Sequence, residues 1–109
     1  MRLSWEIKYT DTALKQLRGM DRPAAGRILD YMEQRIARSA NPRVFGKALS
    51  GSTGLWRYRV GSYRVICQIR EEKCLILAVR IGHRKEIYRN VIRRLGGVAG
   101  VPRPQPPGQ

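Results

Sequence analysis

Side chains that build disulfide frameworks and metal sites are scarce in this chain. It contains two cysteines, Cys67 and Cys74, and one histidine, His83. Two cysteines do not make a disulfide framework, and a reducing cytoplasm is the simplest location for such a chain. No plausible cluster of histidines and carboxylates is present, so we expect no metal ion and no other cofactor.

Long apolar segments are missing as well. Residues 1–6 lack the apolar run of a secretory signal peptide. The longest apolar run, residues 74–79, is too short to cross a bilayer. The length of 109 residues suits one domain with a modest core, and a hydrophobic fraction of 42% fits a globular protein. We therefore expect a small, soluble, cytoplasmic protein.

Acidic residues are also scarce in this chain. Eight Asp and Glu stand against 22 Lys and Arg, which leaves a net charge of +14. That much self-repulsion weakens the compact state, and a polyanionic partner would relieve it. Arginine far outnumbers lysine, and guanidinium groups bind phosphate bidentately and stack on bases. The composition favours a nucleic-acid partner. A bound acidic protein, or a general bias toward arginine codons, would also account for the excess.

The N-terminal part of the chain predicts one strand and two helices. Residues 3–9 alternate between apolar and polar side chains, as in a half-buried strand. Thr10 or Asp11 can cap a helix that ends at Gly19, and Asp21 can cap a second helix. The short link between the two helices predicts an antiparallel hairpin. The core-facing side chains of the second helix are expected to be Ala25, Ile28, Leu29, Met32 and Ile36.

The C-terminal part predicts a sheet. Residues 43–54 are loop-like, and strands are expected at residues 55–60, 63–70 and 74–81. Gly61 and Ser62 fit a two-residue type II′ turn between the first two of these strands. A short basic helix is expected at residues 84–95, followed by a disordered tail rich in Pro and Gly at residues 96–109.

Together these elements predict an α+β fold with the order β-α-α-β-β-β and a terminal helix. The helical hairpin packs on one face of a mostly antiparallel four-stranded sheet, and the other face stays at least partly open. The folded domain is expected to span residues 1–95.

One face of the predicted hairpin carries a cluster of arginines. If Gly61 and Ser62 are the central turn residues, Arg59 lies directly opposite Arg64 and shares its face with Arg57. We call the surface formed by Arg57, Arg59 and Arg64 the arginine face. Opposed arginines repel each other, whereas an anion between them would remove the repulsion and gain charge-assisted hydrogen bonds. The alternative is an exposed face with chance charges, and a one-residue slip of register would break up the cluster.

Four segments, in this order and spacing, carry a family resemblance: YTDTALKQL from Tyr9, KALSG from Lys47, LWRYRVGSYRVICQI from Leu55 and IGHRKEIY from Ile81. Together they resemble the RelE/ParE superfamily of toxins from bacterial toxin–antitoxin pairs, and most closely its RelE-type, ribosome-dependent mRNA endonucleases. The last segment resembles the closing G-[HKR]-R-x-x-x-Y pattern of that family. The family fold agrees with the architecture predicted above.

The resemblance implies an active site formed by Arg57, Arg59, Arg64, Arg84 and Tyr88. It implies metal-independent cleavage, in which the ribose 2′-OH attacks the adjacent phosphate to give a 2′,3′-cyclic phosphate and a 5′-OH. It also implies two kinds of partner, a cognate antitoxin protein and the ribosome with its mRNA.

Three questions stay open at this point. RelE-like sites often have lysines where Arg57 and Arg59 stand, and arginine does not readily lose its proton, so the general base is not identified. Histidine titrates near neutral pH, which makes His83 a catalytic candidate, although it could simply lie at the sheet edge. Tyr88 could be plain helix packing. As rival functions we consider a ParE-type toxin that acts on DNA gyrase, whose members usually lack this full set, and a non-catalytic RNA-binding module.

Overall fold

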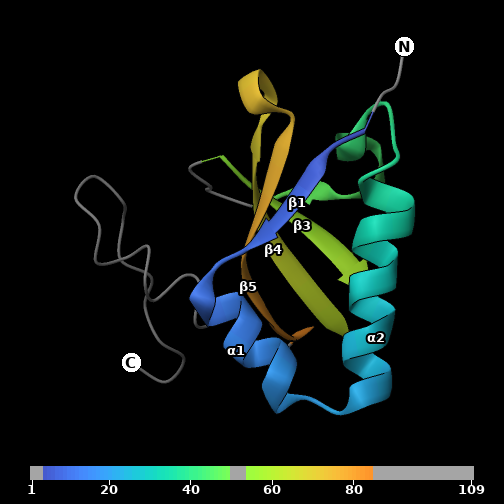
Figure 1. Ribbon diagram of the computed structural model, residues 1–109, viewed down its shortest axis with the longest axis vertical. Helices are drawn as coiled ribbons and strands as arrows, with labels where there is room; N and C mark the ends of the chain where they lie inside the picture. Colours follow the sequence, from blue (N-terminus) through green and yellow to red (C-terminus); the bar gives the residue numbers. More distant parts are fainter. Residues whose placement is uncertain (1–3, 50–53, 85–109) are drawn as a thin grey trace, which may run out of the picture.

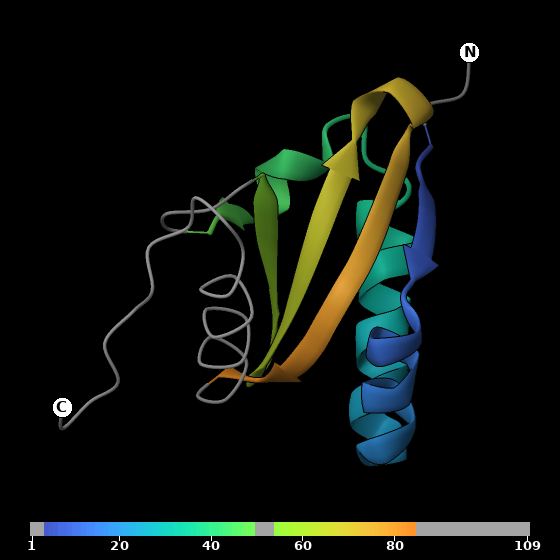
Figure 2. The ribbon, with the colours of Figure 1, turned by 90° about the vertical axis from the view of Figure 1, so that its left-hand side faces the viewer.

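The computed structural model describes residues 4–49 and 54–84 and shows two helices packed on one face of a sheet (Figures 1 and 2). The sheet has five strands in the order β1-β5-β4-β3-β2. β1 runs parallel to β5, and every other neighbouring pair is antiparallel. The α+β class and the order of the predicted strands and helices up to β5 are confirmed. The strands are β1 (Glu6–Tyr9), β2 (Lys47–Ala48), β3 (Leu55–Val60), β4 (Tyr63–Arg70) and β5 (Leu75–His83).

The two helices begin where the sequence predicts. Thr10 caps α1 (Asp11–Gly19), and its hydroxyl also donates to the Val79 carbonyl of β5 at 3.2 Å. The Asp21 carboxylate caps α2 (Arg22–Asp30) by accepting from the Ala24 amide at 3.1 Å. Caps of this kind each contribute about 1 kcal/mol to helix stability. The bond from Thr10 additionally fixes α1 to the strand that carries the closing motif.

The second helix does not continue as a regular α-helix. After α2 the chain forms a π-helical turn at Tyr31–Ile36, closed by a bond from the Ala37 amide to the Met32 carbonyl at 2.8 Å. The predicted core residues Ile28, Met32 and Ile36 are fully buried. The prediction for Leu29 is wrong, because its side chain is 38% exposed and Ala24 lies on the buried stripe instead.

The main core lies between the helices and the sheet. Its sheet residues alternate along β3 and β4, as expected for a sheet with one covered face, whereas those of β5 do not keep strict alternation. Each large apolar side chain buried there contributes about 1.5–3 kcal/mol. The fully or nearly fully buried members from the strands are Tyr58, Val65, Cys67, Ile76, Ala78 and Ile81.

A smaller apolar cluster lies on the opposite face of the sheet. Leu55 and Ile66 are buried there, and Leu49 and Val79 pack against them. This face therefore carries apolar side chains at one end and the arginines further along β3 and β4. The sequence predicts that this face is at least partly open. At the arginine end Arg59 is exposed, whereas Leu55 and Ile66 are buried at the other end.

The stretch predicted as a loop contains two short elements. A 3-10 turn, η2 (Pro42–Phe45), is capped by the Asn41 side chain and leads into β2. β2 pairs with β3 and adds a fifth strand to the predicted four. It escaped prediction because a two-residue strand with both side chains exposed has no apolar alternation to detect.

The hairpin β3–β4 has the predicted boundaries. Gly61 has a φ of +61° and Ser62 has no positive φ, which fits a type II′ turn and excludes type I′. β5 ends at His83, two residues beyond the predicted boundary. The helix predicted at 84–95, except for its first residue, and the tail predicted at 96–109 lie outside the described residues. No helix in the described ranges is long and apolar enough to span a membrane.

Candidate functional site

The predicted arginine face is present, with the predicted register. Arg59 pairs with Arg64 and Arg57 pairs with Ile66, so the three arginines share the face that points away from α1 and α2. Arg59 is exposed and Arg57 is half-buried. Strands β2 to β5 contain no Asp or Glu, so no acidic side chain from these strands interrupts the positive charge.

Arg64 is the buried member of this face. Its exposed fraction is 7%, and among the described residues it is the one charged side chain in the buried class. Its Nη1 donates to the carbonyls of Gly61 and Tyr63, both at 3.0 Å. The ion pairs within residues 4–49 and 54–84 are Lys8–Glu6 and Arg43–Glu71, so neither supplies Arg64 with a carboxylate. Two neutral backbone carbonyls thus fix the guanidinium, and they leave its positive charge uncompensated.

The short strand β2 extends the arginine face with a lysine. Lys47 lies directly opposite Arg57, on the same face of the sheet. Lys47, Arg57 and Arg59 line a cavity of about 230 Å³ together with residues 44–46. The sequence analysis did not select Lys47, because its place on the arginine face depends on β2, a strand that the sequence pattern does not predict.

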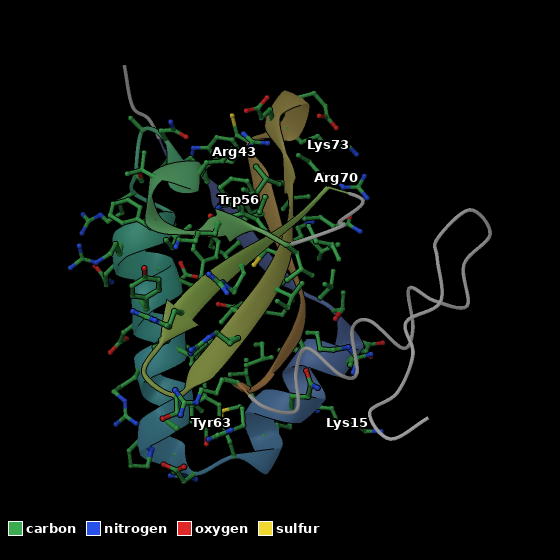
Figure 3. The ribbon with its side chains drawn as sticks, turned by 180° about the vertical axis from the view of Figure 1, so that it is seen from behind. Lys15, Arg43, Trp56, Tyr63, Arg70 and Lys73 are labelled. Atoms are coloured by element: carbon green, nitrogen blue, oxygen red, sulfur yellow. The ribbon has the colours of Figure 1, made fainter. Side chains whose placement is uncertain are left out.

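Gly46 sets how closely this lysine approaches β3. A Cβ at Gly46 would lie 2.3 Å from the Arg57 carbonyl oxygen and 2.7 Å from Nε1 of Trp56, so only glycine fits. Trp56 packs against the main core, and the Arg43 guanidinium lies 5.7 Å from its ring centroid (both are labelled in Figure 3). Because β2 follows Gly46 directly, this close approach positions Lys47 beside Arg57.

A second arginine missed by sequence reasoning comes from β5. Arg80 pairs with Ile66, and Ile66 pairs with Arg57, so these residues form one row across the sheet that continues to Lys47. The β4–β5 register shifts between Ile66 and Cys67. This irregularity breaks strict alternation in β5 and brings Arg80 to the arginine face.

The structure does not bring His83 together with the arginines. His83 pairs with Tyr63, whose side chain packs against the main core on the helix side of the sheet. The two rings are in edge contact, with centroids 6.0 Å apart. Tyr63 lies at the turn end of the hairpin (Figure 3). His83 therefore lies on the helix side of the sheet, away from the arginine face. The β5 residue that pairs with Arg64 is Gly82.

Of the two remaining predicted site residues, the structure describes one, Arg84, which is the last residue of the second described range. Arg84 is exposed, and its amide donates to the Ser62 carbonyl at 2.9 Å, which holds it beside the β3–β4 turn. Tyr88 lies outside the described residues. The predicted set thus divides into four arginines at or near one face, one histidine on the other face, and one tyrosine that the structure does not describe.

A second cavity lies between the second helix and the β3 edge. It has a volume of about 750 Å³ and carries three arginines together with aromatic and aliphatic side chains. The Arg35 guanidinium lies 5.7 Å from the centroid of the Phe45 ring. The residues that line it are Arg27, Asp30, Tyr31, Gln34, Arg35, Arg38, Ser39, Phe45 and Val60.

The groups with shifted titration lie away from the arginine face. Burial raises the pKa of the Tyr58 hydroxyl, which donates to the Pro42 carbonyl at 2.8 Å. Burial also raises the pKa of the Cys67 thiol, so this cysteine is unsuited to nucleophilic chemistry. Within the part of the chain that the structure describes, no group of three or more His, Cys, Asp and Glu side chains could hold a metal ion.

This chain is similar to toxins from bacteria and archaea. Toxin RelG of Mycobacterium tuberculosis is 25% identical over 88 residues, which is 80% of this chain and 99% of RelG. The toxin–antitoxin complex RelBE2 from the same organism contains a chain that superposes with a TM-score of 0.68 at 22% identity, covering 77% of this chain and 95% of that chain. A mutant of E. coli toxin RelE in the free state gives a TM-score of 0.67 at 20% identity, over 84% and 98% of the two chains.

The family assignment rests on a match over most of the chain. The model of the ParE toxin of the type II toxin–antitoxin system parDE matches residues 7–88. This range includes the sheet except for the first residue of β1, both helices and the closing motif. The chain therefore belongs to the ParE toxin family of type II toxin–antitoxin systems, within the RelE/ParE toxin superfamily.

Proposed function

We propose that this toxin is an endoribonuclease that cleaves mRNA on the ribosome without using a metal ion. The observation that carries the proposal is the directly opposed pair Arg59 and Arg64. The neighbouring row across the sheet contains Lys47, Arg57 and Arg80. Strands β2 to β5 contain no acidic residue. In the free protein such a pair is repulsive. A phosphate between the two guanidinium groups would turn this repulsion into attraction.

The chemistry that such a face supports is cleavage by transesterification. The 2′-OH of the ribose attacks the adjacent phosphorus, and the phosphorane-like transition state gains negative charge. Arg64, fixed by the turn carbonyls, would act as a preorganised donor to that charge, and exposed Arg59 would close on the phosphate from the other strand. One such donor is worth about 10²–10³-fold in rate. Tyr88 and Arg84 complete the proposed site, with Tyr88 stacking on or orienting a base.

The ribosome would supply what the protein lacks. The arginine face offers strong phosphate binding but no side chain that readily accepts a proton at neutral pH, and His83 lies on the other face. Orientation of the 2′-OH in line with the scissile bond can supply a large part of the rate. A ribosome that holds mRNA in a bent form would provide this orientation, and the net charge of +14 would favour docking on ribosomal RNA.

The second proposed partner is an antitoxin. The complex RelBE2 and several other similar structures are toxin–antitoxin complexes by name. An acidic or amphipathic antitoxin segment would neutralise the arginine face by occupying the same cations. The cavity lined by Tyr31, Phe45 and Arg35 combines apolar and basic side chains, which suits the same kind of segment.

The test is cleavage of a defined mRNA on translating ribosomes, with the 5′ ends of the fragments mapped. The full-length protein should produce fragments with a 5′-OH and a 2′,3′-cyclic phosphate. Arg64→Ala should lose this activity, whereas Lys15→Ala, which removes an exposed cation from α1, should keep it. Because Arg64 is buried, the exposed Arg59→Ala serves as a second variant whose fold is not at risk. Inhibition of DNA gyrase without any mRNA cleavage would overturn the proposal in favour of the rival toxin activity.

A further inference from the structure

Lys47 is the one lysine in strands β2 to β5, and it stands among arginines. It pairs with Arg57 across β2 and β3, and it lines the same cavity of about 230 Å³ as Arg57 and Arg59. Arginine holds its proton under all ordinary conditions, whereas an ammonium group can release one to a stronger base. Of the cations gathered around this cavity, Lys47 alone combines a positive charge with a transferable proton.

The position of Lys47 is fixed although β2 is only two residues long. On its N-terminal side, Gly46 lies so close to β3 that a side chain would collide with the Arg57 carbonyl. On its C-terminal side, the Leu49 amide donates to the Leu55 carbonyl at 3.1 Å. The preceding turn is held by the buried Tyr58 hydroxyl, which donates to the Pro42 carbonyl at 2.8 Å. These contacts hold the backbone at Lys47 against β3 without restricting its exposed side chain.

We propose that Lys47 is the general acid of the cleavage reaction, a role that rests on the proposed ribonuclease function. The bond from the 2′-oxygen to phosphorus forms as the bond from phosphorus to the 5′-oxygen breaks. The proton of the 2′-OH passes to solvent water. The Lys47 ammonium delivers a proton to the departing 5′-oxygen, which leaves as a 5′-OH, and the neutral amine then regains a proton from water.

This role gives the amine and the guanidinium groups different tasks. Arg57, Arg59 and Arg64 stabilise the charge on the non-bridging phosphate oxygens but cannot protonate the leaving group. A lysine ammonium is already in the protonated form that a general acid requires. A positioned acid contributes about 10²–10⁴-fold to the rate. We therefore expect the loss on replacing Lys47 to fall in that range.

The discriminating variant is Lys47→Arg, which keeps the positive charge and removes the transferable proton. It is compared with wild type, Lys47→Ala and the exposed-cation control Lys15→Ala in single-turnover cleavage of ribosome-bound mRNA. Each protein is given two substrates, one with a normal linkage and one with sulfur in place of the 5′-bridging oxygen at the mapped cleavage site. A thiolate leaves without being protonated, so the sulfur substrate does not need a general acid.

The expected result is that Lys47→Arg and Lys47→Ala cleave the normal mRNA about 10²–10⁴-fold more slowly than wild type and cleave the sulfur substrate at nearly the wild-type rate. A Lys47→Arg protein that cleaves normal mRNA like wild type would overturn the assignment and leave the ribonuclease function intact. A defect that persists on the sulfur substrate would also overturn it, since Lys47 would then act in binding. If wild type cleaves neither substrate, the proposed function itself fails.

Discussion

Removing the charge of Arg59 is expected to stabilise the folded protein while it impairs the proposed activity. Arg59 is exposed and lies directly opposite Arg64, which is 7% exposed and held by two carbonyls. Directly opposed like charges in a strand pair are destabilising by about 0.2–1 kcal/mol. Arg59→Gln keeps the length of the side chain and removes this repulsion. Because Arg59 is exposed, the substitution leaves no buried group unsatisfied.

The size and salt dependence of the effect follow from the same geometry. A gain of about 0.2–1 kcal/mol corresponds to a rise in Tm of roughly 1–8 °C for a domain of this size. The gain should shrink as salt is added, because the screening length falls from about 30 Å at 0.01 M to about 3 Å at 1 M ionic strength. The control is Lys15→Gln on α1, which lowers the net charge of +14 by the same amount and lies in a helix rather than a strand pair.

Urea unfolding at low and high salt measures the effect without adding a charged denaturant. Arg59→Gln should raise the urea midpoint at low salt by more than Lys15→Gln does. The gain should also disappear when Arg64 is already replaced by Gln, as a double-mutant cycle would show. Arg59→Gln could instead lower stability, or Arg59→Gln and Lys15→Gln could raise it equally. Either result would refute the inference that repulsion between Arg59 and Arg64 destabilises the protein in the absence of a bound anion.

Four further outcomes test the contacts that support the site and the core. Gly46→Ala should lower stability by about 1–3 kcal/mol in urea unfolding, because its Cβ has no space against β3. Gly26→Ala in α2, where nothing lies within 4 Å, should raise stability by about 0.5–1 kcal/mol, so equal effects would contradict this account. Tyr58→Phe should cost about 1 kcal/mol through the lost hydrogen bond to the 3-10 turn, and an unchanged midpoint would show that the turn does not depend on it. In native protein a thiol reagent should modify exposed Cys74 and should reach buried Cys67, whose pKa is raised by burial, only after unfolding; rapid reaction of both thiols would contradict the buried assignment.

The β3–β4 hairpin shows why much of this site could be predicted from sequence. A two-residue turn at Gly61 and Ser62 fixes the register, and the register fixes which side chains share a face. The alternation of Trp56, Tyr58 and Val60 then decides which face lies under the helices. Local turn chemistry and a period of two were therefore sufficient to place Arg59 opposite Arg64.

The residues that were missed depend on contacts between distant parts of the chain. β2 exists because Gly46 permits a close approach to β3, and nothing in the local pattern around Lys47 reveals this. Arg80 faces the arginines because the β4–β5 register shifts, which breaks the alternation that would be read from β5 alone. His83 was a catalytic candidate because histidine titrates near neutral pH. It follows Gly82, which pairs with Arg64, and adjacent residues of a strand point to opposite faces.

The distribution of charge on the arginine face links the stability of the protein to its proposed catalysis and its proposed inhibition by an antitoxin. A face with opposed arginines and no acidic residue in strands β2 to β5 is less stable in the free protein than a neutral one. Any polyanion that binds this face recovers that free energy, so the proposed RNA substrate and an acidic antitoxin segment would compete for the same cations. Binding to the folded state also stabilises it by mass action. A substitution such as Arg59→Gln should therefore reduce activity and weaken the antitoxin complex together, while the unbound protein becomes more stable.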